Sequence, residues 1–340
     1  MRPHLLTYPL LLCLSLLAAC ATSIATQLPD VAIADLTKEQ ITQEDLALKS
    51  LQDQREQLTR VSNKVLLANA KLCPKTAYDI GVRTQNLKSY PKTLRSRAQQ
   101  TLDLTQTHQI SYIRPGSPAD KAGVKIGDII IGKAGISYGA ADPAFQSVLS
   151  LGEQSLTFKR GTAFFSATLK PQEICDYKIK LSNSTAINAF ANGNSITVTS
   201  GMLNFVKSDD ELALLIGHEL GHNTMGHIRK IISNLVLTGF NTKYTRPFES
   251  EADYVGMYYL NRAGYSDDNV EDFWRRLSTI NPKSITHAKT HPTLPDRYLR
   301  IAATREEIRQ KKASGEDLIP NFIQDGYFSQ APSGIDPKPQ

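Results

Sequence analysis

The segment His218-Glu219-Leu220-Gly221-His222 carries the residues best suited to chemistry, two histidines with a glutamate between them. Residues four apart in a helix stand on one face, one turn from each other, so His218 and His222 can bind one metal ion. Glu219 lies beside them and can reach a water on that metal. Zinc lowers the pKa of such a water towards neutrality, and the carboxylate can take its proton as the water attacks a carbonyl. The spacing therefore predicts zinc-dependent hydrolysis, with Glu219 as the general base.

A second, acidic segment can complete the metal site. Catalytic zinc takes three protein ligands and leaves a fourth position open. Glu249-Ser250-Glu251-Ala252-Asp253 lies in a helical pattern, in which Glu249 and Asp253 share a face and Glu251 points away. One of that pair can bind zinc while the other accepts a hydrogen bond from a ligand histidine. Alone, the segment could equally be a solvated helix start; with the first motif it favours a metal site. Between the two glutamates we expect Glu249 to be the ligand, because it keeps the four-residue relation to Asp253.

Two other histidines are expected to do no chemistry. His227 follows His222 by five residues, which turns it well off the ligand face of the helix, so we interpret it as structural. His108 lies in a different, β-rich part of the chain and is interpreted as incidental.

His291 has a more open interpretation. It lies four residues after His287, but no glutamate stands between them, and Pro292 disfavours helix at His291. We therefore expect His291 on a turn. Near the zinc it could donate a hydrogen bond to the oxyanion or occupy the open position of the metal; the alternative is a surface histidine beside a turn.

The elements that must position these residues are mainly helical. Ser208 is a good N-cap with Glu211 three residues on, and an apolar stripe follows, so we expect a helix over 208–226. Alternating strands over Tyr177–Leu181 and Ser195–Thr199 precede it. The sequence predicts an α+β fold in which a small sheet accompanies a mainly helical unit, with further helices at about 228–238, 248–262, 267–280 and 295–312.

A long helix and a β-rich segment come before this unit. The helix is predicted to begin at Thr37, with Gln40 completing a capping box, and to stop at Cys73-Pro74. Residues 76–172 are rich in turn residues and β-branched residues, which indicates short strands. We therefore divide this part of the chain into an N-terminal helix, a β-rich domain, a zinc-binding unit and a tail, over 37–73, 74–174, 175–315 and 316–340.

The N-terminus indicates export. A positive residue precedes an apolar stretch that is too short to span a bilayer and ends in Leu17-Ala18-Ala19-Cys20. These residues resemble a bacterial lipobox. We therefore expect a lipoprotein signal peptide over 1–19, a lipidated Cys20 and a tether over 20–36; the alternative is an ordinary secretory signal. Ala21 after the cysteine implies, by the same resemblance, the periplasmic face of the outer membrane.

Cys73 and Cys175 remain in the exported body of the chain. An even pair of cysteines in an exported protein predicts a disulfide. The alternative is two buried free thiols. The pair brackets the β-rich segment, so a bridge would close the base of that segment.

Residues 110–131 resemble the PDZ domains of bacterial exported proteases. They read as a strand, a Pro-Gly turn, one short helix closed by Gly123, and a Gly127-Asp128 turn that leads into an apolar strand. Ile80-Gly81-Val82 is similar to the carboxylate-binding loop of those domains. The resemblance implies that backbone N–H groups at these three residues bind C-terminal or extended peptides; the alternative is a spacer domain.

Over roughly 180–300, the chain resembles the gluzincin family of the CAAX prenyl protease, HtpX and periplasmic proteases that tend outer-membrane protein assembly. The segments that carry the resemblance are 187–190, 196–201, 218–222, 249–253 and His291-Pro292 with Arg297. It implies the zinc ligands His218, His222 and Glu249, the general base Glu219, and Asp253 behind a ligand histidine. It also implies that a strand at Asn188-Ala189-Phe190 pairs with extended substrate.

We expect a lipid-anchored metalloendopeptidase, with one Zn²⁺ per chain, that acts on exported proteins, in particular unfolded or misassembled envelope proteins. The net charge of +6 is mild, so the composition predicts no nucleic-acid partner. One alternative is a chaperone or scaffold with a structural zinc, against which the intact Glu219 argues. Another is a hydrolase of peptidoglycan peptides.

Overall fold

The structure is a computed structural model that describes residues 28–132, 135–237, 246–268, 270–280, 282–283 and 294–324. The chain divides into two compact units, Met1–Asp45 and Leu46–Gln340. Within the described ranges, no helix has the length and apolar character needed to cross a bilayer.

The first unit, as far as it is described, holds the opening turns of helix α2 (Ile33–Ala68). The helix begins four residues before the predicted start. Thr37 therefore lies inside the helix, and its hydroxyl donates to the Ile33 carbonyl at 3.0 Å instead of capping. The predicted capping box of Thr37 and Gln40 is wrong, because the helical backbone continues back through Asp35 to Ile33.

In the second unit, α2 turns an apolar stripe into the core. Leu58, Val61, Val65 and Leu66 are all buried. The α-helix ends at Ala68, and a 3₁₀ turn over Ala70–Leu72 brings the chain to Cys73. The helix thus stops just ahead of the Cys73-Pro74 boundary, where the following proline disfavours helix.

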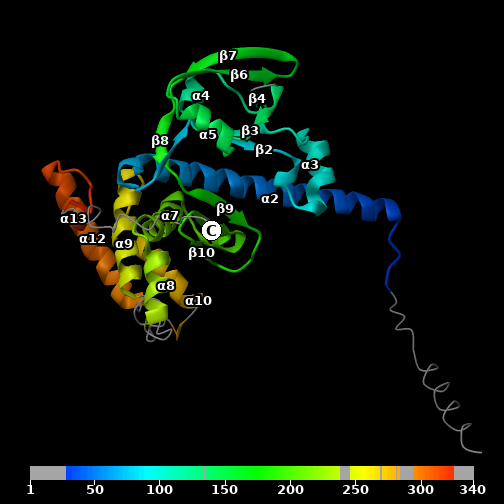
Figure 1. Ribbon diagram of the computed structural model, residues 1–340. Coiled ribbons are helices and arrows are strands. Elements are labelled where there is room, and N and C mark those ends of the chain that lie inside the picture. The colour runs from blue at the N-terminus through cyan, green and yellow to red at the C-terminus, as the bar shows by residue number, and fades with distance from the viewer. Residues whose placement is uncertain are drawn as a thin grey trace, which may run out of the picture. The chain divides into compact units, whose positions relative to one another are not determined.

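A β-rich insert, residues 76–175, follows α2. Its first strand, β1 (Thr76–Asp79), pairs antiparallel with its last, β8 (Gln172–Cys175), so the insert begins and ends at one place (Figure 1). A disulfide between Cys73 and Cys175 joins its two ends, with the Cα atoms 5.6 Å apart. Between these strands lie β2 (Val82–Gln85), α3 (Arg95–Leu102), β3 (Gln109–Ile113), α4 (Pro118–Lys121), β4 (Ile129–Ile131), β5 (Ser137–Tyr138), α5 (Pro143–Leu149), β6 (Gln154–Arg160) and β7 (Ala163–Leu169).

The insert has its own apolar core, which includes Ile80, Ile110, Ile130 and Phe158. Its sheets have the orders β2-β3 and β5-β4-β6-β7. A separate core indicates that the insert is stabilised mainly by its own packing.

After the insert comes a small mixed sheet of order β10-β11-β9. β9 (Lys178–Ser182) runs parallel to β11 (Ser195–Thr199), and β10 (Ala189–Ala191) runs antiparallel to it. β10 therefore lies at an edge of the sheet as described. The helices that complete the fold are α6 (Ser200–Phe205), α7 (Asp209–Thr224), α8 (His227–Leu237), α9 (Arg246–Arg262), α10 (Val270–Ile280), α12 (Leu294–Ser314) and α13 (Asn321–Gln324).

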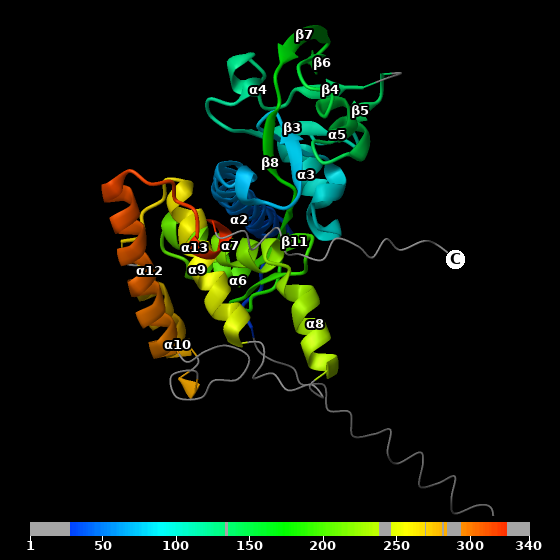
Figure 2. The same ribbon diagram turned by 60° about the vertical axis from the view of Figure 1, so that its left-hand side comes forward.

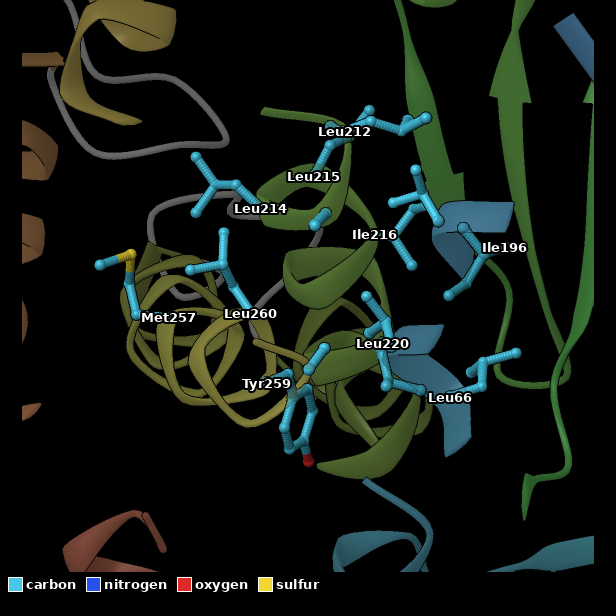
Figure 3. Packing of buried hydrophobic residues seen from close by; sticks show 14 of the residues in the cluster. Leu66, Ile196, Leu212, Leu214, Leu215, Ile216, Leu220, Met257, Tyr259 and Leu260 are labelled. Atoms are coloured by element: carbon cyan, nitrogen blue, oxygen red, sulfur yellow. The ribbon is translucent and has the colours of Figure 1, made fainter. Parts of the chain in front are cut away.

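Helix α7 lies at the centre of the main core. Ile216 and Leu220 point towards Ile196 of β11 and Leu66 of α2, as Figure 3 shows. On its other side α7 packs against α9, which in turn has α12 alongside it (Figure 2). The fold is thus a mixture of helix and sheet with helix predominant, which confirms the predicted class at that level.

Glycines let α7 and α9 approach backbone to backbone. A Cβ added at Gly217 would lie 2.7 Å from the carbonyl oxygen of Gly256, and one at Gly256 would lie 2.8 Å from the His218 nitrogen. Both distances are shorter than real Cβ contacts. This close approach brings the carboxylates of α9 within reach of the histidines of α7.

Candidate metal centre

Helix α7 holds His218, Glu219 and His222, and all three are buried. The helix begins where the sequence predicts, because the Ser208 hydroxyl accepts a hydrogen bond from the Glu211 N–H at 3.2 Å. Glu219 follows His218 directly, so the glutamate stands beside the ligand face of the helix. The motif is thus presented on a rigid, capped element.

The two histidines and Glu249 of α9 converge on one point. The Nε2 atoms of His218 and His222 lie 3.1 Å apart. The Glu249 carboxylate oxygens lie 3.5 Å from the first of these atoms and 3.4 Å from the second. These three residues form the group of possible metal-binding side chains found in the described part of the chain.

The spacing of these donors fits a tetrahedral zinc ion. Ligand atoms at about 2.0–2.1 Å from zinc, in a tetrahedron, lie about 3.3 Å from one another. The observed separations of 3.1, 3.4 and 3.5 Å bracket that value. Two imidazoles and one carboxylate are also a donor set that zinc accepts in catalytic sites.

Asp253 sets the orientation of His218. Its Oδ1 lies 2.8 Å from His218 Nδ1. A carboxylate can only accept here, so Nδ1 carries a hydrogen and Nε2 is the ring nitrogen that faces the other donor groups. Burial by itself lowers the pKa of His218, but Asp253 and Glu249 outweigh that effect and raise the pKa to about 10. Without a metal, this site therefore favours a proton where a metal would bind.

Arg297 of α12 completes this corner of the site. It donates to Asp253 Oδ1 at 2.6 Å, and its guanidinium lies 3.5 Å from the centre of the Trp274 ring. Burial favours a neutral Asp253, whereas Arg297 and His218 together hold the pKa of Asp253 below its ordinary value. The sequence singled out Arg297 only through the family resemblance, and it offered no signal for Trp274.

His227 lies against the metal motif, contrary to the expectation that it faces away. Helix α7 ends at Thr224, two residues before its predicted end, and Gly226 has φ +66°, a left-handed conformation that ends helices. The chain turns there, and His227 Nδ1 comes to lie 3.1 Å from His222 Nδ1. Glu251 does face away from Glu249, but it faces His227 Nε2, at 2.9 Å. The glycine after the helix was the sequence signal for this turn.

The Asn188-Ala189-Phe190 segment leads into the edge strand β10. Ala189 and Phe190 belong to β10, the edge strand, and the Phe190 side chain is 47% exposed. Asn223, which follows the second histidine of the motif, accepts a hydrogen bond from the Gly193 N–H at 2.7 Å. Asn223 was missed from the sequence; it ties the β10–β11 hairpin to α7.

In the insert, Ile80-Gly81-Val82 forms a loop whose two outer side chains are buried. The Ile80 carbonyl accepts from the Ala119 N–H, and the Gly81 carbonyl accepts from the Arg114 N–H. Gly81 has φ +86°, and a Cβ there would lie 2.2 Å from the Ser117 Cβ, so glycine is required.

The Arg114 side chain connects this loop to α2. It donates to Asp79 at 2.8 Å, to Gln172 at 2.6 Å and to Asn63 of α2. The loop is therefore tied to a helix that forms part of the main core. Cys20, His287 and His291 lie outside the described residues.

A family model described as Peptidase family M48 matches residues 162–238 and 229–306. This span contains His218, Glu219, His222, Glu249 and Asp253. The mitochondrial metalloendopeptidase OMA1 of Arabidopsis thaliana is 30% identical over 141 residues, which are 34% of this chain and 29% of that protein. The beta-barrel assembly-enhancing protease of Yersinia pestis is 25% identical over 181 residues, 41% of this chain and 37% of that protein.

The metalloprotease YcaL of Escherichia coli strain K12 is 24% identical over 170 residues, which are 42% of this chain and 63% of that protein. The chain thus covers less than two thirds of each of these relatives. Among solved structures, the PDZ domain of HtrA3 bound to a phage-derived ligand matches at 20% identity with a TM-score of 0.23, over 29% of this chain and 90% of that domain. The family and relatives support an enzyme of the metalloendopeptidase class.

Proposed function

We propose that this chain is a gluzincin-type zinc metalloendopeptidase of the M48 kind. His218, His222 and Glu249 would hold the zinc, and Glu219 would act as the general base. The observation that carries the proposal is the convergence of three buried donor groups at the edge lengths of a tetrahedral site. The family match over the same residues supports it independently.

Each residue then has a task in peptide hydrolysis. Zinc bound here would supply a Lewis acid that polarises the scissile carbonyl and acidifies a water. Glu219 takes the proton of the attacking water and passes it to the leaving amine. Asp253, held by Arg297, keeps His218 in the tautomer that presents Nε2 to the metal.

The substrate would bind in an extended form along β10. An edge strand has free backbone N–H and C=O groups that can pair with another strand. β10 contacts α7, the helix of the metal motif, and Asn223 holds the hairpin in place. This arrangement favours unfolded or flexible segments, which can adopt the strand conformation, over folded domains.

For the natural setting, we propose a lipoprotein on the periplasmic face of the outer membrane, anchored through Cys20, that acts on misassembled envelope proteins. The lipobox-like N-terminus supports the anchor, and the relative named for β-barrel assembly supports the setting. We further propose that the insert is PDZ-like and binds C-terminal peptides at Ile80-Gly81-Val82. The left-handed Gly81 and the tie through Arg114 to α2 support a loop of defined shape there.

The test is zinc content and proteolysis of the purified chain on a permanently unfolded protein substrate. We expect one zinc per chain, cleavage that a chelator abolishes, and recovery when zinc is returned. A metal-free chain that cleaves the substrate as fast as the zinc-loaded chain would contradict the proposal. The Glu219→Gln variant, purified in the same way, controls for contaminating peptidases.

A further inference from the structure

The second histidine of the metal motif, His222, is backed by two further polar side chains in contact with each other. His227 is completely buried, at 0% exposure, and its Nδ1 lies 3.1 Å from His222 Nδ1. On its other side, His227 Nε2 lies 2.9 Å from Glu251 Oε2. Three side chains from α7, α8 and α9 thus form one continuous line that ends at the proposed ligand His222.

The position of His227 is built into the backbone. Gly226, with φ +66°, ends helix α7 and turns the chain directly before His227, and the imidazole packs against Phe248 with the ring centres 5.0 Å apart. An apolar side chain would fill this space at lower cost, because burying an imidazole requires partners for both nitrogens. His227 has both.

The hydrogens along this line can be placed by elimination. Glu251 is a carboxylate with a partly exposed side chain, so it accepts, and His227 Nε2 must donate to it. His227 Nδ1 is then an acceptor, and the hydrogen between the two imidazoles belongs to His222 Nδ1. His222 Nε2 is consequently left with a free lone pair, directed at His218 Nε2 and Glu249.

The opposite placement fails on the same geometry. If His227 Nδ1 carried the hydrogen, its Nε2 lone pair would face the carboxylate of Glu251 at 2.9 Å. His222 would then carry its hydrogen on Nε2, aimed into the group of donors where a metal would bind. That tautomer cannot bind a metal through Nε2.

We propose that Glu251 and His227 form a relay that positions His222 for metal binding, by fixing its Nδ1–H tautomer and the orientation of its ring. Each histidine of the motif then has a carboxylate behind it that fixes its tautomer. Asp253 supports His218 directly, and Glu251 supports His222 through His227. Glu251 and His227 are positioning residues. The inference rests on the zinc centre of the proposed function.

The outer end of the relay opens to a groove between α9 and α12. Glu251 is one of the groove-lining residues, and its side chain is 23% exposed. Glu251 therefore reaches solvent, whereas His227 is fully buried. The relay thus joins a carboxylate at the protein surface to a buried imidazole beside the proposed ligand His222.

The first test measures zinc affinity in the full chain by competition with a chelator of known affinity. Removing a group of this kind behind a metal ligand typically weakens binding about 10–100-fold. We expect that loss for His227→Ala and for Glu251→Ala. Glu251→Gln should retain most of the affinity, since its amide oxygen can still accept from His227 Nε2.

A double-variant cycle separates a relay from ordinary packing. His227→Ala already disconnects Glu251, so His227→Ala/Glu251→Ala should bind zinc as weakly as His227→Ala alone. If the double variant lost zinc affinity by the product of the two single-variant losses, the relay would be overturned. Glu306→Ala, which removes an exposed carboxylate from α12, and His108→Ala, which removes an imidazole from the insert, are the matched controls. Both should bind zinc like the unmodified chain.

The second test reads the tautomers directly by ¹⁵N NMR of the histidine rings in the zinc-loaded chain. We expect the hydrogen of His227 on Nε2 and that of His222 on Nδ1. A hydrogen on His227 Nδ1 would overturn the relay, even if zinc is bound. If the unmodified chain binds no zinc, the proposed function fails instead. Glu251→Ala changes only a groove-lining side chain, so it keeps the test informative should His227→Ala not fold.

Discussion

Among single residues, Glu219 has a different proposed role from the three proposed metal ligands around it. His218, His222 and Glu249 present donor atoms to one point. Glu219 lies on α7 with the two histidines but is not part of that group. Losing a ligand should therefore remove the metal, and losing Glu219 should remove only the chemistry.

Glu219→Gln is expected to keep zinc bound and to lower proteolysis by about 10²–10⁴-fold, because a general base contributes on that scale. The amide has the same shape as the carboxylate, so folding should not change. The measurement pairs zinc content with cleavage rate on one sample. Normal turnover by this variant would rule out the proposed role of Glu219.

Glu249→Ala is expected to lose stoichiometric zinc, because a third ligand disappears. Glu251→Ala should keep zinc at saturating metal concentration, since Glu251 contacts His227 and not the proposed ligand point. Trp274 is the single tryptophan of the chain, and its ring centre lies 6.4 Å from that of His218. Its fluorescence can therefore follow a Co²⁺ titration of both variants. If Glu249→Ala bound metal fully and Glu251→Ala lost the metal, Glu251 and not Glu249 would be the ligand.

Arg297→Met is expected to lower the free energy of unfolding by about 3 kcal/mol, because it leaves the buried Asp253 carboxylate without its guanidinium partner. Arg300→Met on the same helix is the control. Its side chain is 61% exposed and pairs with Asp296 at the surface, so the loss should stay below about 1 kcal/mol. Urea unfolding of the two metal-free variants makes the comparison. Equal losses would show that Arg297 is not needed to hold Asp253.

Where elements meet, the site depends on how closely α7 and α9 approach. Gly217 and Gly256 face each other across that contact, and Ala252 faces Gly221. Small residues allow the backbones to touch, and the touching backbones set the distance between the histidines of α7 and Glu249 of α9. The contact therefore sets the spacing of the proposed metal ligands as well as the packing of the two helices.

Gly256→Ala is expected to destabilise the chain by about 1–3 kcal/mol, as overpacking does, although alanine is the better helix former by about 1 kcal/mol. Its Cβ would lie 2.8 Å from the backbone nitrogen of His218, which cannot move alone. Zinc affinity should fall with stability. Gly221→Ala, with its nearest contact at 3.2 Å, should cost less. If Gly221→Ala lowered stability more than Gly256→Ala, packing would not be what limits this contact.

For the whole molecule, the insert is the main addition to the metal-binding unit. It enters and leaves through the paired strands β1 and β8, and the disulfide Cys73–Cys175 lies at this base. Arg114 adds a buried tie from the insert to Asn63 of α2. The base of the insert is thus held by a covalent bond, a strand pair and a polar network.

Replacing both cysteines by serine is expected to lower the free energy of unfolding, by up to about 4–5 kcal/mol in the chain-entropy model, because the bridge closes a span of 102 residues. Calorimetry of the double variant against the unmodified chain measures this loss. Thiol labelling under denaturing, non-reducing conditions should find no free thiol at either position. Free thiols in protein from an oxidising compartment would contradict the bridge.

The sequence by itself determined the residues whose geometry is local. Four-residue spacing on a helix places His218 beside His222 whatever the rest of the fold does. The same rule relates Glu249 to Asp253, and it places Glu251 on another side of that helix. These predictions needed only the direction of side chains on one helix.

Only the tertiary structure decided what surrounds that motif. His227 reaches His222 because α7 ends at Thr224 and Gly226 takes a left-handed φ, whereas periodicity alone continues the helix and turns His227 away. Arg297 reaches His218 across 79 residues of sequence, and Glu251 reaches His227 across 24. Such contacts depend on how α8, α9 and α12 pack on α7. Helix-to-helix packing is set by the fit of whole surfaces, here by glycines in close contact, and the spacing of residues along one helix carries no record of it.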